Sequence, residues 1–393
     1  MRIAFFCDNG YPEMSGIVDS ILTTSGALIE RGHEIVFVGP HYSAKDYTVV
    51  KQTPPKPGVR EVVDGITIVH LPSVPLPKSP TGQSHFSFPT GASFSYLKEF
   101  KPDIVHTHSP YGVGIEAMRA AKRFHTPLIG TNHTPIEEYY PIGKSMMRKF
   151  DAWYYNHCHF MTTPYSELIA NMQSVGFHRP ARELPNPAPL TLFHAPTPEE
   201  KKAQKEKLGL TGPVVLYCGN FFAGKKIDVV LKAAANLLPE FPTLTFVVVG
   251  RGEEDGRLKA LAHTLSIEKN VVWPGFIPRD KLLPYYQAAD VFTIMSEVDT
   301  QSLTLMQAFA TGLPAVGARA RGLPDFLPET CGFLVEPGSV KECTARVREL
   351  LHDEKLAAQM SEAATIYVKQ FAPEIIATRW LDIYERALVD FSS

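Results

Sequence analysis

The sequence predicts an α/β protein made of two domains, each a doubly wound parallel sheet with helices on both faces. Short apolar strands alternate with amphipathic helical stretches along both halves of the chain, which is the pattern of such sheets. The length of 393 residues fits two domains at ~150 residues each. A proline-rich stretch, Leu184–Pro198, interrupts the alternation near the middle and is the expected linker.

The first half opens with a β-α-β unit. The apolar strand Ile3–Cys7 leads through a polar loop into the amphipathic helix Ile17–Arg31, and a glycine then separates this helix from the strand Glu34–Val38. The same theme of a strand followed by a helix recurs at Asp103–Thr107, Pro127–Thr131 and Phe160–Thr163. Residues 71–91 contain too much proline for a core strand, so we expect them to run over the surface.

The second half begins with a charged helix, Glu199–Leu208, after which the alternation starts again. The strands that we expect there are Val214–Cys218, Leu244–Val249, Val271–Trp273, Val291–Ile294, Ala315–Val316 and Phe333–Val335. Three helical stretches close the chain, at Val340–Leu351, Glu354–Gln370 and Pro373–Phe391. We therefore expect a first domain over residues 1–190, a second over residues 191–372, and a final helix, 373–393, that crosses back to the first domain.

Charge and cysteine content exclude several classes of protein. The chain has 39 basic and 41 acidic side chains, a formal charge of −2, which argues against a nucleic-acid partner. Its five cysteines are widely spaced and form no Cys-x-x-Cys pair, so we expect neither a disulfide framework nor a zinc site. No stretch reaches the ~20 apolar residues of a membrane span. We expect a cytoplasmic protein that lies at most on a membrane surface.

The motifs that could carry chemistry follow the strands, where two facing sheets of this kind would form a central cleft. In the first half, Gly10 and Gly16 bracket the loop before the first helix, where glycine lets the backbone approach a phosphate. An ordinary turn explains these glycines equally well. His108 and His133 follow adjacent strands. A single histidine is more often structural, but two at neighbouring strand ends favour a functional site.

His133 is the stronger candidate of the two histidines. An acidic and aromatic stretch, Glu137, Glu138, Tyr139 and Tyr140, follows it on the loop that enters the next helix.

In the second half, a loop ends in Lys225 and Lys226 at the start of a helix. Positive charge at a helix N-terminus opposes the helix dipole and is unfavourable unless an anion is bound there. The two lysines therefore indicate a diphosphate site. A solvated lysine pair is the alternative. The backbone groups of Phe276 and Ile277, at another strand end, could bind the flat base of a nucleotide.

The segment ADVFTIMSEVDTQSLTLMQAFATGLPAVG is the most informative. Asp299 lies in its polar turn, and Gln307 lies within the short helix that follows. The backbone amides expected to point from the start of that helix toward a ligand belong to Thr300, Gln301, Ser302 and Leu303.

Taken together, these motifs resemble the retaining GT-B glycosyltransferases of family four, over nearly the whole chain. The segments that carry the resemblance are FFCDNGYPEMSGIVDSI, RGHEI, LPSVPLPKSP, DIVHTHSPYGVG, TNHTPIEEYY, ELPNP and SEVDTQSLTLMQAFATGLP. The likeness is strongest to lipid-directed members, the glucosyl-diacylglycerol synthases and phosphatidylinositol mannosyltransferases. It implies the GT-B fold and transfer of a sugar from a UDP- or GDP-linked donor to a lipid or glycolipid acceptor.

The resemblance also assigns residues to the donor. It implies that Gly16 lets the donor diphosphate approach and that His133 contacts the transferred sugar. The family's Arg-x4-Lys clamp on the diphosphate falls on Asn220 and Lys225, so that only the lysine is kept.

The family's Glu-x7-Glu motif falls on Asp299 and Gln307. In relatives the first carboxylate orients the hydroxyls of the donor sugar and the second holds the ribose. The Gln keeps hydrogen-bonding capacity but loses the charge. We expect Arg251 to compensate for the missing arginine and Glu297 for the missing carboxylate.

Retention in this family is thought to proceed on one face of the sugar, with the leaving phosphate accepting the acceptor's proton. Catalysis then depends on stabilising the diphosphate through Lys225 and backbone amides. No Asp-x-Asp is present near the strand ends, so we expect no metal and no cofactor besides the nucleotide sugar. Because three of the four signature positions differ, the alternative is a degenerate GT-B protein that binds a sugar nucleotide or a partner without turnover.

Residues 143–155, GKSMMRKFDAWYY, form a helical segment that has two possible interpretations. Lys144, Arg148 and Lys149 lie beside an expected apolar stripe of Met146, Met147, Phe150, Trp153 and Tyr154. This stripe either packs on the first sheet, as every helix of such a fold buries a face, or lies in the headgroup layer of an anionic membrane.

Overall fold

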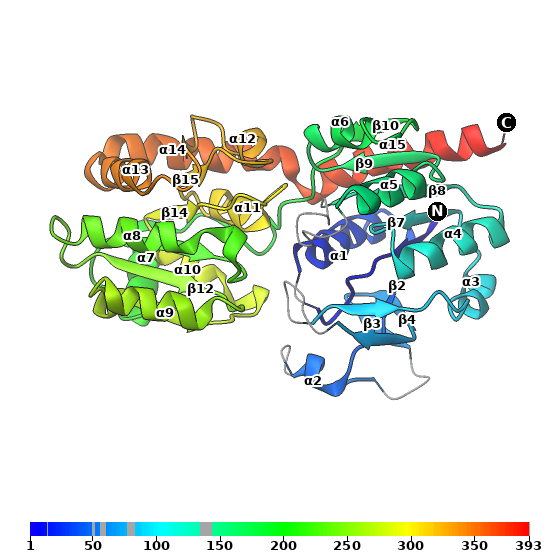
Figure 1. The fold of residues 1–393 in the computed structure, drawn as a ribbon, viewed down its shortest axis with the longest axis horizontal. Coiled ribbons are helices and arrows are strands. Elements are labelled where there is room, and N and C mark those ends of the chain that lie inside the picture. Colours follow the sequence, from blue (N-terminus) through cyan, green and yellow to red (C-terminus); the bar gives the residue numbers. More distant parts are fainter. Residues whose placement is uncertain (14, 49–51, 56–59, 77–82, 134–143, 393) are drawn as a thin grey trace. The chain divides into compact units, whose positions relative to one another are not determined.

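The computed structural model describes residues 1–13, 15–48, 52–55, 60–76, 83–133 and 144–392. The chain divides into two compact units (Figure 1). The first contains Met1–Pro187 and Pro373–Ser393, and the second contains Ala188–Ala372.

The first unit is built on an eight-stranded sheet with the strand order β10-β9-β8-β7-β1-β2-β4-β3. Its strands are β1 (Arg2–Phe6), β2 (Glu34–Pro40), β3 (Glu61–Val63), β4 (Ile66–Leu71), β7 (Ile104–Thr107), β8 (Leu128–Thr131), β9 (Phe160–Thr163) and β10 (Ala181–Glu183). Neighbouring strands run parallel except for β3, which pairs antiparallel with β4. Every residue of β7 and β8 is buried, because helices cover both faces of a parallel sheet.

Helices complete the first unit. They are α1 (Gly16–Ile29), α2 (Ala44–Tyr47), α3 (Phe94–Phe100), α4 (Gly112–Phe124), α5 (Lys144–Tyr155), α6 (Glu167–Gln173) and α15 (Pro373–Ser392). The last helix, α15, packs against α1, and its Ile376, Trp380 and Tyr384 join the core cluster of Ile3 and Phe5. The chain therefore returns to the first sheet at its end.

After Leu71, which ends β4, the described residues of the proline-rich segment, 72–76 and 83–91, lie outside the eight-stranded sheet, as the composition predicts. These residues are not structureless, however. Two short strands, β5 (Ser73–Pro75) and β6 (His85–Ser87), pair antiparallel as a separate two-stranded sheet.

The second unit contains a six-stranded parallel sheet with the order β13-β12-β11-β14-β15-β16. Its strands are β11 (Val214–Cys218), β12 (Thr245–Val249), β13 (Val271–Gly275), β14 (Val291–Ile294), β15 (Ala315–Ala318) and β16 (Gly332–Val335). Its α-helices are α7 (Pro198–Lys207), α8 (Ile227–Leu237), α9 (Asp255–Thr264), α10 (Leu283–Ala288), α11 (Leu303–Ala310), α12 (Leu323–Phe326), α13 (Val340–His352) and α14 (Glu354–Tyr367). The predicted two-domain parallel-sheet architecture is confirmed.

Two simpler expectations concern the whole chain. All five cysteines are buried free thiols, so none forms a disulfide. Within the described residues, no helix combines the length and the apolar character that crossing a bilayer requires.

Candidate functional site

In the second unit, two loops meet at the carboxyl ends of the adjacent strands β11 and β14. Gly224 lies where they meet, and a Cβ there would come within 2.9 Å of Cγ1 of Val298. The N–H of Glu297 donates to the carbonyl of Gly224 at 3.0 Å. Glycine is thus needed for the close approach of the two loops, which carry the predicted Lys225 and Asp299.

Lys225 and Asp299 form an ion pair. Nζ of Lys225 lies 2.6 Å from Oδ1 of Asp299, and each side chain is 16% exposed. Next to this pair, Nζ of Lys226 lies 3.4 Å from Oε2 of Glu297. Lys225 is therefore not a solvated lysine, which was the alternative interpretation of the sequence.

The second carboxylate oxygen of Asp299 is the most informative atom of this loop pair. Oδ2 is buried and has no hydrogen-bond partner in the described part of the chain. A buried carboxylate oxygen without a donor is costly, so such an atom calls for an explanation. A ligand hydroxyl would supply the missing donor.

The backbone holds Asp299 in place from a third loop. The N–H of Gly322 donates to the carbonyl of Asp299 at 3.1 Å, and a Cβ on Gly322 would lie 1.6 Å from the carbonyl oxygen of Thr300. Ser302 caps α11, because its Oγ accepts from the N–H of Leu305 at 3.2 Å. The amides from Thr300 to Leu303 thus lie in the turn and at the first position of α11, as predicted; Gln301 and Ser302 are buried.

Gln307 has a partner that the sequence did not reveal. Its side chain is buried, and its Oε1 accepts from the hydroxyl of Tyr286 in α10 at 2.7 Å. Burial raises the pKa of Tyr286, so this phenol stays protonated and donates. The side-chain oxygen of Gln307 thus accepts one hydrogen bond from within the unit.

The other predicted donor residues lie at neighbouring strand ends. The guanidinium of Arg251, after β12, lies over the ring of Phe276, after β13, at 5.0 Å from its centroid. The carbonyl of Asn220 accepts from the hydroxyl of Tyr217 at 3.2 Å. Phe276 and Ile277 are partly exposed. Among the described contacts, none joins Arg251 to Lys225.

In the first unit, the two predicted histidines meet. Nδ1 of His108 lies 2.8 Å from Nε2 of His133, and the rings stack at 5.1 Å between centroids. Both are buried, and burial lowers the pKa of His133 to about 3. The pKa of His108 is also lowered, by burial and then by its histidine neighbours. Two neutral imidazoles therefore share one proton in this hydrogen bond.

Sequence reasoning missed a third histidine beneath this pair. Nδ1 of His106 lies 2.8 Å from the hydroxyl of Tyr384, and its Nε2 lies 2.8 Å from Oγ1 of Thr131. Burial lowers the pKa of His106 as well. Its partner Tyr384 belongs to α15, far along the chain, so no local pattern could have signalled the contact. Nε2 of His108 is buried without a hydrogen-bond partner among the described residues.

Gly16 is the first residue of α1 and is exposed. The preceding Ser15 caps the helix, because its Oγ accepts from the N–H of Val18 at 3.2 Å. The stretch of Glu137, Glu138, Tyr139 and Tyr140 lies outside the described residues.

The predicted stripe on α5 does not lie on one surface. Tyr154 is buried and donates to the carbonyl of Gly114 at 2.7 Å, whereas Met146 and Trp153 are 73% and 46% exposed. Periodicity placed Tyr154 with them, but Tyr154 lies on the buried face of α5, together with Asp151, Ala152 and Tyr155. Arg148 donates to the carbonyl of Asn171 and to Oγ of Ser174, both at 3.1 Å. Lys144 and Lys149 are exposed.

Within the described ranges, no group of three or more His, Cys, Asp or Glu side chains is placed to hold a metal ion. Metal independence stays a prediction.

The two halves of the chain match two families of known proteins. The family described as Glycosyltransferase Family 4 matches residues 14–192, and the one described as Glycosyl transferases group 1 matches residues 198–366. The chain is 22% identical over 406 residues to an alpha-monoglucosyldiacylglycerol synthase of Acholeplasma laidlawii, covering 98% of each chain. It is 28% identical over 337 residues to the synthase of the same name from Streptococcus pneumoniae, covering 80% of this chain and 70% of that protein.

The fold also has solved counterparts. The Anabaena protein HepE, in complex with UDP, superimposes with a TM-score of 0.79 at 16% identity, over 98% of this chain and all of that one.

Proposed function

As the chain belongs to the GT-B glycosyltransferases, with a family 4 first half and a group 1 second half, we propose that it is a retaining hexosyltransferase that uses a nucleotide diphosphate sugar. Membership of these families favours sugar transfer over the binding-only alternative. The observation that carries the finer proposal is the Lys225–Asp299 pair with its unpartnered Oδ2.

The lysine of this pair would hold the diphosphate. Its ammonium has three N–H groups, of which one reaches Asp299 at 2.6 Å, so others remain for phosphate oxygens. During transfer the bond between the anomeric carbon and the phosphate oxygen breaks, and a bond to the acceptor oxygen forms on the same face. The acceptor's proton passes to the leaving phosphate. Lys225 and the amides at the start of α11 would stabilise the growing charge on that phosphate.

The aspartate would hold the sugar. A hydroxyl of the donor hexose that donates to Oδ2 would satisfy the buried oxygen, and Oδ1 would stay with Lys225. One side chain would thereby link the position of the sugar to that of the diphosphate, which is how positioning contributes to rate. Asn220 lacks the charge of the family's arginine, so the clamp would rely on Lys225.

His133 would contact the transferred sugar in its neutral form. A pKa of about 3 means that its ring carries no charge at neutral pH. It can therefore donate or accept one hydrogen bond from a sugar hydroxyl without adding a cation. Gly16, exposed at the start of α1, leaves the helix N-terminus open for a phosphate.

We further propose a lipid acceptor and a peripheral position at the inner face of a membrane. The two relatives from Acholeplasma and Streptococcus are both named alpha-monoglucosyldiacylglycerol synthase, and the product in that name is a sugar joined to diacylglycerol. Acceptors of that kind reside in a bilayer, so the enzyme must work at its surface.

The test is an assay of purified protein with UDP- and GDP-hexoses and diacylglycerol in vesicles, with and without EDTA. We expect a glycolipid whose anomeric proton, read by NMR, has the configuration of the donor, formed equally in EDTA. Inversion would overturn the retaining mechanism. Nucleotide binding with neither transfer nor donor hydrolysis would establish the binding-only alternative.

A further inference from the structure

The two-stranded sheet of β5 and β6 presents four large apolar side chains to solvent. Val74, Leu76, Phe86 and Phe88 are 46%, 38%, 42% and 43% exposed. Val74 lies directly opposite Phe86, and alternation along each strand places all four on one side. The rings of Phe86 and Phe88 contact each other edge to face at 5.5 Å. We call these four residues the β5–β6 face.

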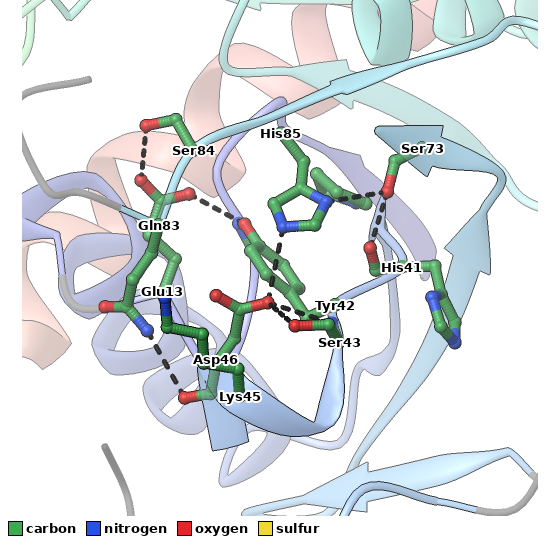
Figure 2. A network of polar contacts seen from close by, with 12 residues as sticks. Glu13, His41, Tyr42, Ser43, Lys45, Asp46, Ser73, Gln83, Ser84 and His85 are labelled. Atoms are coloured by element: carbon green, nitrogen blue, oxygen red, sulfur yellow. Dashed lines mark hydrogen bonds and ion pairs between the residues drawn. The ribbon is translucent and has the colours of Figure 1, made fainter. Parts of the chain in front are cut away.

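The opposite side of the same sheet is polar and fixed to the first unit. His85 is buried, with Nε2 at 3.3 Å from Oδ2 of Asp46 and Nδ1 at 3.1 Å from Oγ of Ser73. Ser84 donates to Oε1 of Glu13 at 2.8 Å, and Figure 2 shows these contacts around the sheet. A two-stranded sheet has little stability of its own. These contacts hold it so that the apolar face points outward.

The charges that border the sheet are unevenly exposed. Lys45, in α2, is exposed and has no ion pair within the described residues. The side chain of Arg119, in α4, is 47% exposed; it donates to the carbonyl of Pro89 and lies 3.9 Å from Oε2 of Glu116. The nearby acids are turned inward. Asp46 pairs with His85, and Glu116 is buried against the amides of Gly91 and Ser93.

The backbone next to the face is already satisfied. The N–H of Leu76 donates to the carbonyl of Ser84, and the N–H of Phe88 donates to the carbonyl of Pro72, both at 2.9 Å. Covering the face with apolar material would therefore leave these amides paired, which is the condition for backbone that enters a lipid layer.

We propose that the β5–β6 face docks on the surface of an anionic lipid bilayer, with Phe86 and Phe88 in the acyl boundary and Lys45 and Arg119 among the headgroups. The exposed cations and inward acids match a negative surface, and the aromatic pair matches its apolar edge. This inference rests on the proposed lipid acceptor, and it identifies the surface that brings the enzyme to that acceptor.

The test is co-sedimentation with vesicles of phosphatidylglycerol and phosphatidylcholine, and with phosphatidylcholine alone. We expect wild type to bind the anionic vesicles. The double variant Phe86→Asp plus Phe88→Asp should bind them with an affinity at least about tenfold lower, because two apolar contacts with the lipid are lost. Val62→Asp is the matched control, since Val62 in β3 is 64% exposed and lies outside the face. Lys45→Glu is a second variant that leaves the aromatic residues in place and should also weaken binding.

Hydrolysis of the soluble donor separates this inference from the proposed function. We expect the double variant to hydrolyse donor at the wild-type rate without vesicles, so a loss confined to vesicle binding supports the docking surface. Equal vesicle binding by wild type and the double variant would overturn the inference. So would a loss seen only in Met146→Asp plus Trp153→Asp, which would assign docking to α5. A wild-type dimer that the double variant dissociates, without vesicle binding, would instead assign the face to a second copy of the chain.

Discussion

The two candidate sites of this protein use opposite electrostatics. In the second unit, Lys225 and Asp299 form a charged pair at 2.6 Å that keeps some exposure to solvent. In the first unit, His106, His108 and His133 form a buried cluster whose lowered pKa values keep it neutral. A charged pair suits a diphosphate, whereas a neutral cluster suits sugar hydroxyls. We therefore propose that only the charged pair stabilises the leaving diphosphate, whereas both sites contact the sugar, Asp299 through a carboxylate and His133 through a neutral imidazole.

The largest expected effect breaks the charged pair. We predict that Lys225→Ala lowers kcat/KM for donor hydrolysis by about 10²–10³-fold, because one preorganised donor to the leaving group is lost. Its neighbour Lys226 pairs with Glu297 instead, so Lys226→Ala should lose less than about tenfold and serves as the control. Equal losses in both variants would show that only the total charge of the loop matters.

A smaller effect concerns the buried contact between Gln307 and Tyr286 in the same unit. Gln307→Leu leaves the Tyr286 hydroxyl without its acceptor, so we expect a loss of about 1–3 kcal/mol in unfolding free energy. Adding Tyr286→Phe should restore most of it, as measured by urea unfolding of the two single variants and the double variant. If Gln307 also holds the ribose, Gln307→Leu will raise the KM for donor in the double variant too. An unchanged KM would confine Gln307 to packing.

The neutral cluster can be tested by its pH dependence. Below pH ~6.5 an unfolded histidine binds a proton, whereas folded His133 does not until about pH 3. Its contribution to stability is therefore complete above pH ~6.5 and is lost as the pH falls toward 3, at ~1.4 kcal/mol per pH unit. Urea unfolding at pH 6 and pH 5 should show a shallower decline for His133→Gln than for wild type, and exposed His178→Gln should follow wild type. Parallel declines in all three proteins would mean that His133 is charged in the fold.

The smallest expected effect concerns α5, next to the neutral cluster. Arg148 donates to two oxygens of the segment that ends α6, so Arg148→Glu should cost about 1 kcal/mol in unfolding free energy. Exposed Lys149→Glu should change it by less than ~0.5 kcal/mol. Thermal unfolding would compare the two, and equal shifts would show that the Arg148 contacts add nothing.

The sequence predicted well those features that depend on a local pattern of residues, such as the positions of the strands. Apolar runs located β11 and β14, and strand order then brought Lys225 to Asp299, because parallel strands end at the same edge. Contacts made by packing could not be predicted. The bond between His106 and Tyr384 joins residues 278 positions apart, and the partner of Gln307 belongs to another helix. Periodicity grouped Tyr154 with Trp153 but could not say which side of α5 the rest of the unit covers.

The same limit explains the β5–β6 sheet. Proline content correctly kept Ser73–Pro75 and His85–Ser87 out of the core sheet. It gave no sign that the buried contact between His85 and Asp46 would fix them as strands. Polar anchoring across sequence-distant residues, rather than strand propensity, makes this surface.

We propose that Asp299 holds the donor sugar while Lys225 holds the diphosphate, and the variant Asp299→Asn separates these two roles. The asparagine keeps the shape of the side chain but removes the carboxylate that would accept a sugar hydroxyl at Oδ2. Calorimetric titration with the nucleoside diphosphate and measurement of kcat on the same protein give both quantities. We predict that kcat falls about 100-fold or more while the affinity for the diphosphate stays within about threefold of wild type. An unchanged kcat, or a loss of diphosphate affinity as large as the loss of kcat, would contradict it.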